Sequence, residues 1–473
     1  CADLISALGD KVHLPGSVAY DASLASYFSA QAADLNPACI VSPDTVQDVT
    51  ASLQIMTSPS PPSDASKGVR DCPFAVRSGG HTLYHGAANI AQGVTVDLKG
   101  LSSVHVSPDG SAVSAGPAAT WDKLYTALDP LGLSVVGGRT AGVGPWRRDI
   151  FFSPRYGWTC DTVSAFQVVL ANGSVVEANT QQNPSLFKAL RGGSNNFGIV
   201  TRVDLQTFQQ EQMWGGMAYH PMSTLEDHVE EFVGINSAED YDEFASLVTS
   251  FGFNPEVGAA ISDQMIYTKP LPNPPPIYER LLDLPTLLST MRLTNMTDLA
   301  LETSSFQTQG LRYVYLTNTV YSTPENLRSA FESFNASLPS IQSIQGIQWS
   351  VTLEPLPPAI YTRHAAANSL GMENRTEALV VVLLTASWEL SADDDTIYAA
   401  ANRVLTRINQ EAQNSGSWDP FVYLNYAGAS QDPVSAYGEK SVDHLRQVRD
   451  EVDPNFVFTK MVPGGFKIPV DRS

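Results

Sequence analysis

Residues 74–82 constrain the fold of this chain more than any other stretch, and they read FAVRSGGHT. An apolar run ends in Arg77 and Ser78, paired glycines follow, and His81 comes directly after them. A buried strand that stops at paired glycines exposes consecutive backbone N–H groups with no side chains in the way, and such a nest binds pyrophosphate. We therefore expect a phosphate-binding turn here, with His81 beside the group that carries the phosphates.

The size and charge of the chain limit what it can bind. A chain of 473 residues predicts two or three domains. Hydrophobic residues make up 43% and charged residues 16%, which is typical of a soluble globular protein with large cores. The net charge of −21 disfavours nucleic acid and anionic lipid, and no apolar run of about 18 residues could span a membrane. We expect a small-molecule ligand and no nucleic-acid or membrane partner.

The cysteines and the first residue favour secretion. Four cysteines fit an oxidising compartment, and a chain that begins at Cys1 without an initiator methionine is typical of a mature form after signal-peptide removal. A Cys1–Cys39 disulfide is our first choice, and Cys1–Cys72 stays open because connectivity cannot be read from sequence. Glycosylation sequons, which permit secretion, begin at four asparagines: Asn172, Asn295, Asn335 and Asn374.

Short strands dominate residues 74–205. Residues 166–178 predict a β-hairpin with an Asn-Gly turn at 172–173. Thr120 is placed to cap a helix that stops before Pro130.

The pattern changes between residues 208 and 420. Strand-like runs such as 213–219, 312–317 and 378–384 alternate there with amphipathic helices such as 396–412. This alternation predicts an antiparallel sheet with helices on one face, an α+β arrangement. We expect mainly short loops in residues 421–473.

Three glycine-rich stretches could bring backbone close to a bulky ligand: residues 77–81, residues 137–144 together with 156–157, and residues 191–198. None fits a Rossmann fingerprint, a P-loop or a nucleophile elbow. The eight histidines are scattered and predict no metal site.

Four motifs carry a resemblance to a known family. They are VRSGGH at 76–81, SPRYGWTCD at 153–161, RGGSNNFG at 191–198 and YLNY at 423–426. With these four motifs in this order, the chain resembles the fungal berberine bridge enzyme-like oxidases of the vanillyl-alcohol oxidase and para-cresol methylhydroxylase superfamily. The resemblance implies a para-cresol methylhydroxylase-type FAD-binding domain in residues 1–207, a substrate domain in 208–420, and a C-terminal segment, 421–473, that returns to the FAD domain.

The resemblance also implies the cofactor site. His81 matches the histidine that bonds the 8α-methyl group of FAD. The implied FAD-binding residues are Arg77, Ser78, Gly79, Gly80, His81, Thr82, Gly142, Val143, Gly144, Gly198, Ile199, Val200, Asn425 and Tyr426. Tyr426 is our candidate catalytic base, although a phenol with a pKa of about 10 is a poor base unless its neighbours lower that pKa. The alternative is that Tyr426 only packs against the flavin ring. His364, Tyr361, Trp349 and Glu354 are further pocket candidates, with structural roles as their alternative.

Two departures from the family pattern stand out. Many relatives carry a cysteine that makes a second flavin bond, and Gly138 stands at that place, so we expect no cysteinyl link. Relatives continue their Gly-Val-Gly motif into further glycines, whereas residues 145–149 read PWRRD. Such side chains would clash with a flavin. Because codons for this block read one base later can encode Leu-Gly-Gly-Gly, we expect either a frame or splice error or a real change that damages FAD binding.

The activity implied by the resemblance is that of an FAD-dependent oxidase. Hydride passes from an alcohol, sugar or secondary-metabolite substrate to flavin N5, and oxygen is reduced to hydrogen peroxide. We expect a monomer. Two alternatives remain open: a non-catalytic or FAD-deficient homologue, because of the 145–149 block, and a flavin dehydrogenase that excludes oxygen.

Overall fold

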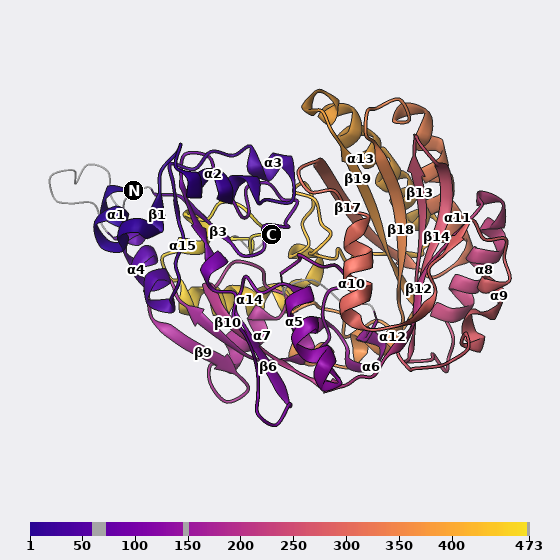
Figure 1. Cartoon of the computed structure of the whole chain (residues 1–473), viewed down its shortest axis with the longest axis horizontal. Helices are drawn as coiled ribbons and strands as arrows, with labels where there is room; N and C mark the ends of the chain where they lie inside the picture. The colour runs from indigo at the N-terminus through magenta and orange to yellow at the C-terminus, as the bar shows by residue number, and fades with distance from the viewer. Residues whose placement is uncertain (59–71, 145–150, 471–473) are drawn as a thin grey trace.

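The computed structural model describes residues 1–58, 72–144 and 151–470 (Figure 1). The 145–149 block lies outside these residues. The N-terminal half occupies the left of Figure 1 and a large sheet occupies the right, while the C-terminal segment runs back to the left.

The phosphate-binding turn predicted at 77–81 follows the edge strand of a small sheet. The strand order is β1–β2–β4–β3, with β2, β4 and β3 parallel and β1 antiparallel to β2. The strands are β1 Val12–His13, β2 Cys39–Val41, β3 Phe74–Arg77 and β4 Val94–Asp97, and the helices before them are α1 Ala2–Leu8, α2 Val18–Ala25, α3 Ala30–Ala33 and α4 Val46–Thr57. Parallel strands are typically buried on both faces, and all residues of β3 and β4 except the partly exposed Val76 are buried.

A second, antiparallel sheet has the order β5–β6–β10–β8–β9. Its strands are β5 Val104–Val106, β6 Ala112–Ala115, β8 Val163–Val169, β9 Val175–Asn179 and β10 Ile199–Gln206; β7 Leu133–Ser134 pairs separately with β11 Phe208–Gln209. The helices of this part are α5 Trp121–Leu128, α6 Ser153–Tyr156 and α7 Pro184–Leu190. Strands β8 and β9 form the predicted hairpin, and α5 begins after Thr120, whose side chain makes no capping hydrogen bond.

The described residues between 213 and 419 form an antiparallel nine-stranded sheet of order β15–β12–β14–β13–β18–β19–β17–β20, with β16 also paired to β12. The strands are β12 Met213–His220, β13 Ala245–Asn254, β14 Gly258–Tyr267, β15 Leu288–Ser289, β16 Arg292–Thr294, β17 Arg312–Tyr321, β18 Gln348–Leu356, β19 Leu379–Trp388 and β20 Trp418–Asp419. Helices α8 Leu225–Asn236, α9 Glu279–Leu282, α11 Pro324–Ser337 and α13 Asp394–Asn414 pack on one face (Figure 1). The predicted α+β class, with an antiparallel sheet covered by helices, is confirmed.

The other face of this sheet looks toward the N-terminal half. Helices α10 Met296–Ser305 and α12 Pro358–Thr362 contribute to the core on this side. Side chains alternate along each strand, so Ile266 of β14 and Leu356 of β18 join that core, while Met265 and Leu353 join the helix-covered core. Neighbouring residues on one strand therefore serve two different environments.

The C-terminal segment contains helices α14 Glu439–Val452 and α15 Val457–Lys460, so the expectation of short loops was wrong for α14. Its buried apolar residues are Val442, Leu445 and Val448, three residues apart within a strongly charged sequence. Such a narrow apolar stripe is a weak sequence signal. In Figure 1 helix α14 crosses the left half of the molecule, below the label of β3 and above that of β10.

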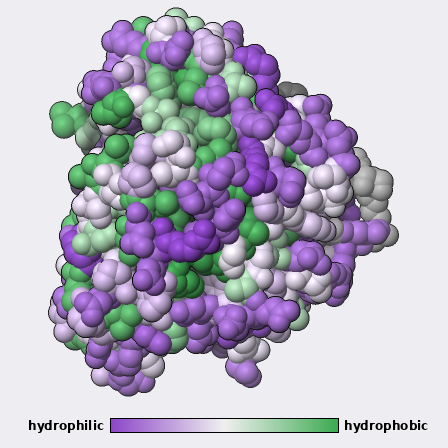
Figure 2. Space-filling view, turned by 90° about the vertical axis from the view of Figure 1, so that its right-hand side faces the viewer, coloured by the Kyte–Doolittle hydropathy of each residue, from purple (hydrophilic) through white to green (hydrophobic). Residues whose placement is uncertain are grey.

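Cys1 is bonded to Cys39, as our first choice of pairing predicted. The bond ties α1 to β2, which enters the first sheet. None of the helices in the described part of the chain has the length and apolarity needed to cross a membrane. On the face seen in Figure 2, hydrophilic and hydrophobic residues are intermixed.

The disulfide closes a loop with a sequence separation of 38 residues. We expect Cys1→Ser to lower the free energy of unfolding by about 4 kcal/mol, because the open loop raises the entropy of the unfolded chain. Urea denaturation of this variant, with Cys72→Ser as the matched control, measures the effect. A Cys1→Ser midpoint equal to that of the control would contradict the assignment.

Candidate functional site

Arg77 supports the phosphate-binding turn from behind. Its buried guanidinium donates from Nη1 to the Ser23 carbonyl oxygen at 2.7 Å and from Nη2 to the Ser26 carbonyl oxygen at 2.9 Å. Its Cζ atom lies 3.8 Å from the centre of the Tyr27 ring, and Nη1 lies 3.4 Å from Oδ2 of Asp97. Arg77 therefore ties the end of β3 to α2 and β4.

His81 is held by stacking at the end of this turn. Gly80 has a φ of 71°, a left-handed conformation that favours glycine. Its carbonyl oxygen accepts a hydrogen bond of 3.2 Å from the Phe28 backbone N–H. The Phe28 ring stacks on the His81 ring with centroids 4.4 Å apart. The imidazole is thus held in a defined orientation beside the turn.

Residues 142–144 meet the turn through backbone. A Cβ atom on Gly79 would lie 3.0 Å from the Gly144 nitrogen, and a Cβ on Gly142 would lie 3.6 Å from Nε2 of His81. The close approach at Gly79 leaves little room for a side chain. The first two glycine-rich stretches of the sequence therefore form one continuous wall.

Helix α5 anchors the 142–144 stretch. The Gly142 backbone N–H donates to Oδ1 of Asp122 at 2.7 Å, and the Trp121 backbone N–H donates to the Val143 carbonyl oxygen at 3.0 Å. Both partners lie in the first turn of the helix. The start of α5 thus sets the position of these glycines.

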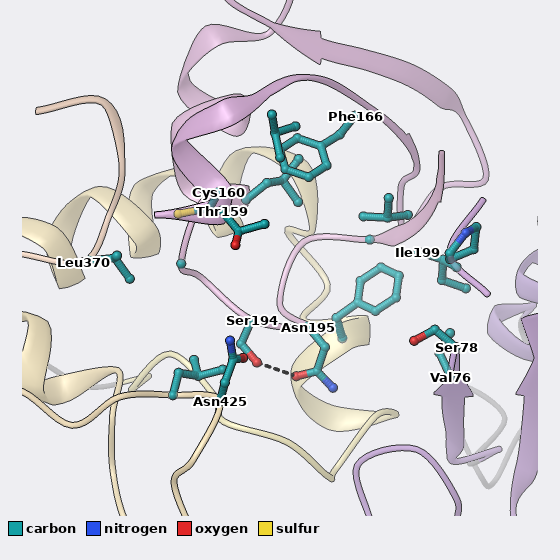
Figure 3. A pocket seen from close by; sticks show the side chains of 18 of the residues that line it. Val76, Ser78, Thr159, Cys160, Phe166, Ser194, Asn195, Ile199, Leu370 and Asn425 are labelled. Atoms are coloured by element: carbon teal, nitrogen blue, oxygen red, sulfur yellow. Dashed lines mark hydrogen bonds between the residues drawn. The ribbon is translucent and has the colours of Figure 1, made fainter. Parts of the chain in front are cut away.

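Two cavities open beside this wall, one of about 350 Å³ and one of about 240 Å³. Six residues line both: Val76, Ser78, Ser194, Asn195, Leu424 and Asn425. The larger cavity, shown in Figure 3, adds Gly198, Ile199 and Val200. The smaller cavity adds Gly79, Gly80, His81, Thr82, Val143 and Gly144. Eleven of the fourteen residues implied for FAD binding therefore come together, and Arg77, Gly142 and Tyr426 adjoin them in the chain.

The wall common to both cavities includes amide groups whose C-terminal partners we did not predict. Asn195 donates from Nδ2 to the Gly464 carbonyl oxygen at 3.0 Å, and Asn196 donates to that of Phe466 at 2.9 Å. The Lys467 ammonium donates to Oδ1 of Asn195 at 3.0 Å. Burial lowers the pKa of Lys467 to about 7, which Asp453 only partly offsets. The Gly-Gly pair at 464–465 was the available sequence signal.

A buried polar group lies behind Asn425. The Tyr426 hydroxyl donates to Oε1 of Glu354 at 2.8 Å, and Nη2 of Arg139 donates to the same oxygen at 2.9 Å. Nη1 of Arg139 donates to Oε1 of Gln264 at 3.0 Å. Tyr426 also packs edge-on against Tyr315, which lines the smaller cavity, with ring centroids 6.0 Å apart.

This environment raises the pKa of Tyr426 well above its usual value. Burial is the main cause, Glu354 adds to it, and Arg139 opposes it. A free phenolate base would need neighbours that lower the pKa of Tyr426. The surroundings of Tyr426 raise that pKa instead. The geometry instead makes Tyr426 a proton donor to a carboxylate.

Other candidates lie elsewhere. Trp349 packs in the helix-covered core, and the Tyr361 hydroxyl donates to the Glu377 carbonyl oxygen at 2.7 Å. His364 lies beside Gly157, where a Cβ atom would approach its Cδ2 atom to 3.0 Å. Cys160 lines the larger cavity, and burial raises the pKa of its thiol well above the ordinary value.

Comparison with known proteins identifies the family. The model of the FAD binding domain matches residues 37–179. The FAD-dependent monooxygenase sdcF of Emericella nidulans is 34% identical over 481 residues, which cover 99% of this chain and 98% of sdcF. The chain belongs to the same family of FAD-linked oxidoreductases as sdcF. The family resemblance drawn from the four sequence motifs is therefore confirmed.

Two further matches bear on fold and extent. The crystal structure of 6-hydroxy-D-nicotine oxidase from Arthrobacter nicotinovorans superposes with a TM-score of 0.79 at 19% identity, covering 97% of this chain and 98% of that one. This match confirms the fold of the family. Oligopeptidase PhomG' of Diaporthe leptostromiformis is 41% identical over 470 residues, covering 98% of this chain, but the chain spans only 37% of its length.

The described residues fit an FAD group. The two cavities share a wall, which suits an extended ligand with two ends. Glycine backbone at residues 79–80 supplies N–H donors without side chains, and the half-buried Lys467 lies beside the shared wall. Apolar residues such as Ile199 and Val200 line the larger cavity and suit an aromatic ring.

Proposed function

We propose that the protein is an FAD-dependent oxidase that removes hydride from a hydroxyl-bearing carbon of a small molecule. The observation that carries this proposal is the Tyr426–Glu354 hydrogen bond of 2.8 Å beside the cavities. Bound FAD would accept the hydride and pass the electrons to oxygen, which yields hydrogen peroxide.

The buried pair can accept the substrate proton in spite of the high pKa of Tyr426. As the substrate hydroxyl transfers its proton to Tyr426 Oη, the phenol can transfer its own proton to Glu354 Oε1. No free phenolate then forms, and the carboxylate is the final acceptor. Arg139 holds that carboxylate in place through its 2.9 Å contact. Tyr426 is therefore both the catalytic residue and a relay.

The charge of the protein limits the substrate class. The net charge of −21 disfavours anionic substrates. Neutral alcohols, sugars and secondary-metabolite rings meet this condition. The name monooxygenase carried by sdcF makes oxygen insertion the competing outcome.

We also propose that the protein is secreted and works as a monomer. The Cys1–Cys39 disulfide supports an oxidising compartment. The sequon asparagines support glycosylation because all four are exposed: Asn172, Asn295, Asn335 and Asn374.

We retain residues 1–207, 208–420 and 421–473 as the proposed division into an FAD-binding part, a substrate part and a returning segment.

The oxidase assignment is tested with a panel of alcohols, sugars and phenolic natural products. We expect a yellow protein that releases one hydrogen peroxide per oxidised substrate, with no oxygen atom in the organic product. Peroxide assay and mass spectrometry under ¹⁸O₂ measure the two outcomes. Labelled oxygen in the product would favour a monooxygenase, slow reoxidation in air a dehydrogenase, and a colourless protein the FAD-deficient homologue.

Tyr426→Phe removes the relay oxygen while keeping the ring. We expect kcat to fall by about 100-fold to 10,000-fold with flavin content unchanged, because the substrate proton loses its acceptor. We expect the kcat of Glu354→Gln to fall by a factor in the same range, because the amide cannot take the phenol proton. Stopped-flow measurement of flavin reduction checks both variants.

Tyr20→Phe is the matched control for the relay variants. It also removes a buried hydroxyl, one that donates to the Pro37 carbonyl oxygen at 2.8 Å. Full turnover of Tyr426→Phe, or an equal loss in the control, would remove Tyr426 from the proton path.

We propose that His81 is the covalent flavin link, because its ring is fixed by Phe28 and lines the smaller cavity. The flavin is expected to stay with the protein after acid precipitation, and a peptide containing His81 should carry the flavin mass. In His81→Ala the flavin should separate from the precipitate. Flavin retained by that variant, or found on another residue, would contradict the link.

A further inference from the structure

Three potential metal-ligating side chains meet in the substrate part, remote in sequence from the flavin motifs. His220 ends β12, His228 lies on α8, and Asp263 lies on β14, the strand paired with β12. Each is at most 1% exposed, and their ligand atoms all lie within 4.8 Å of one another. The cluster lies between the sheet and α8, toward the right of Figure 1.

Backbone carbonyls orient both imidazole rings. Nδ1 of His220 lies 3.0 Å from the Pro285 carbonyl oxygen, and Nδ1 of His228 lies 2.7 Å from that of Thr224. A carbonyl oxygen only accepts, so each Nδ1 carries the hydrogen, which in a neutral ring leaves the lone pair on Nε2. Metal-bound histidines show this arrangement, with the other ring nitrogen donating to a carbonyl or carboxylate.

Both Nε2 atoms face the same carboxylate oxygen. Oδ2 of Asp263 lies 2.8 Å from Nε2 of His228 and 3.7 Å from Nε2 of His220. The Thr249 hydroxyl donates to the other oxygen, Oδ1, at 2.6 Å. This hydrogen bond holds the carboxylate so that Oδ2 faces the two imidazoles.

His220 supplies the independent sign of a ligand. Its side chain is fully buried, and its Nε2 makes no hydrogen bond among the described residues. The separation of 3.7 Å from Asp263 is too long for one. A buried lone pair aimed at a carboxylate is unfavourable unless a cation lies between them.

We propose that His220 Nε2, His228 Nε2 and Asp263 Oδ2 bind one divalent transition metal ion, with Zn²⁺ as the best match. Two imidazoles and one carboxylate form a ligand set that Zn²⁺ accepts, and water can complete the tetrahedron. Ligand atoms of a tetrahedral zinc site lie about 3.3 Å apart. The separations of 2.8 and 3.7 Å bracket that value, so small side-chain shifts suffice.

Metal binding exchanges one proton for one metal ion. Without metal, Nδ1 of His228 lies 2.7 Å from the Thr224 carbonyl oxygen and Nε2 lies 2.8 Å from Oδ2 of Asp263, so both ring nitrogens face hydrogen-bond acceptors. The ring then carries hydrogen on both nitrogens. On binding, His228 releases the Nε2 hydrogen to solvent and gives that lone pair to the metal.

The site is structural and does not belong to the proton path. Asp263 and Gln264 are consecutive on β14 and point to opposite faces of the sheet. Gln264 contacts Arg139 on the cavity side, whereas Asp263 contacts His228 on the helix side. A metal here connects β12, α8 and β14 behind the sheet.

The competing explanation is a metal-free ion pair between His228 and Asp263. The two explanations differ over His220, because His220→Gln leaves that ion pair intact. The metal site requires this variant to lose its metal. The ion pair requires it to behave as the wild type toward metal.

The experiment uses the full-length protein with its flavin, treated with a chelator and then dialysed against Zn²⁺. We expect one zinc per chain by elemental analysis in the wild type and at least a tenfold lower content in His220→Gln and Asp263→Asn. In the wild type, added Zn²⁺ should raise the thermal midpoint, with the unfolding constant falling about 100-fold at 100 times the dissociation constant.

His105→Gln is the matched control, because His105 is exposed on β5 and remote in sequence from the cluster. It should retain one zinc and the full thermal shift. A wild type that binds no stoichiometric zinc and shows no thermal shift overturns the proposal without any variant. Equal zinc content in the wild type and His220→Gln also overturns it.

Discussion

The close backbone contact between Gly79 and Gly144 is the constraint on which the site depends. The two residues belong to stretches 65 positions apart, and a Cβ atom on Gly79 would lie 3.0 Å from the Gly144 nitrogen. This contact brings residues 142–144 against the turn that ends in His81. Arg77 fixes one side of the wall through α2, and α5 fixes the other through Asp122. Side chains from other segments line the two cavities that open beside these glycines.

Strand alternation then separates the chemical environments. On β18, Leu353 packs under the helices while Glu354 reaches Tyr426 and Arg139. On β14, the cavity-side residue Gln264 likewise contacts Arg139. One sheet therefore presents a polar network to the flavin half and an apolar core to its helices. The His220–His228–Asp263 cluster is the polar exception on the helix side, which is why it calls for a separate explanation.

Sequence reasoning succeeded where the signal was local. The β8–β9 hairpin has its Asn-Gly turn, and β12, β17 and β19 were found from their apolar runs, although β17 and β19 extend several residues further than predicted. Helix α14 was missed because its apolar stripe is narrow and its other residues are charged. The glycine-rich cavity walls could be anticipated only because paired glycines and a family resemblance marked them.

Contacts between residues that are distant in the sequence could not be predicted in the same way. Tyr426 and Glu354 are 72 residues apart, and His228 and Asp263 are 35 apart. Each lies in an element whose own pattern is explained by packing alone. The expectation of no metal ligands came from the scattered histidines, and scattering in sequence says little about separation across a sheet. Only the tertiary fold brings these side chains together.

Charge supplies the last link between fold and cofactor. The chain carries a net charge of −21, yet Lys467 lies half-buried beside the wall that the two cavities share. An ammonium withdrawn from water is unfavourable without an anion, and desolvation lowers the pKa of Lys467 to about 7 despite the opposing effect of Asp453. An anionic group in the neighbouring cavity would favour the charged lysine. The pyrophosphate of FAD is such a group, so cofactor binding would relieve a cost that the folded chain otherwise carries.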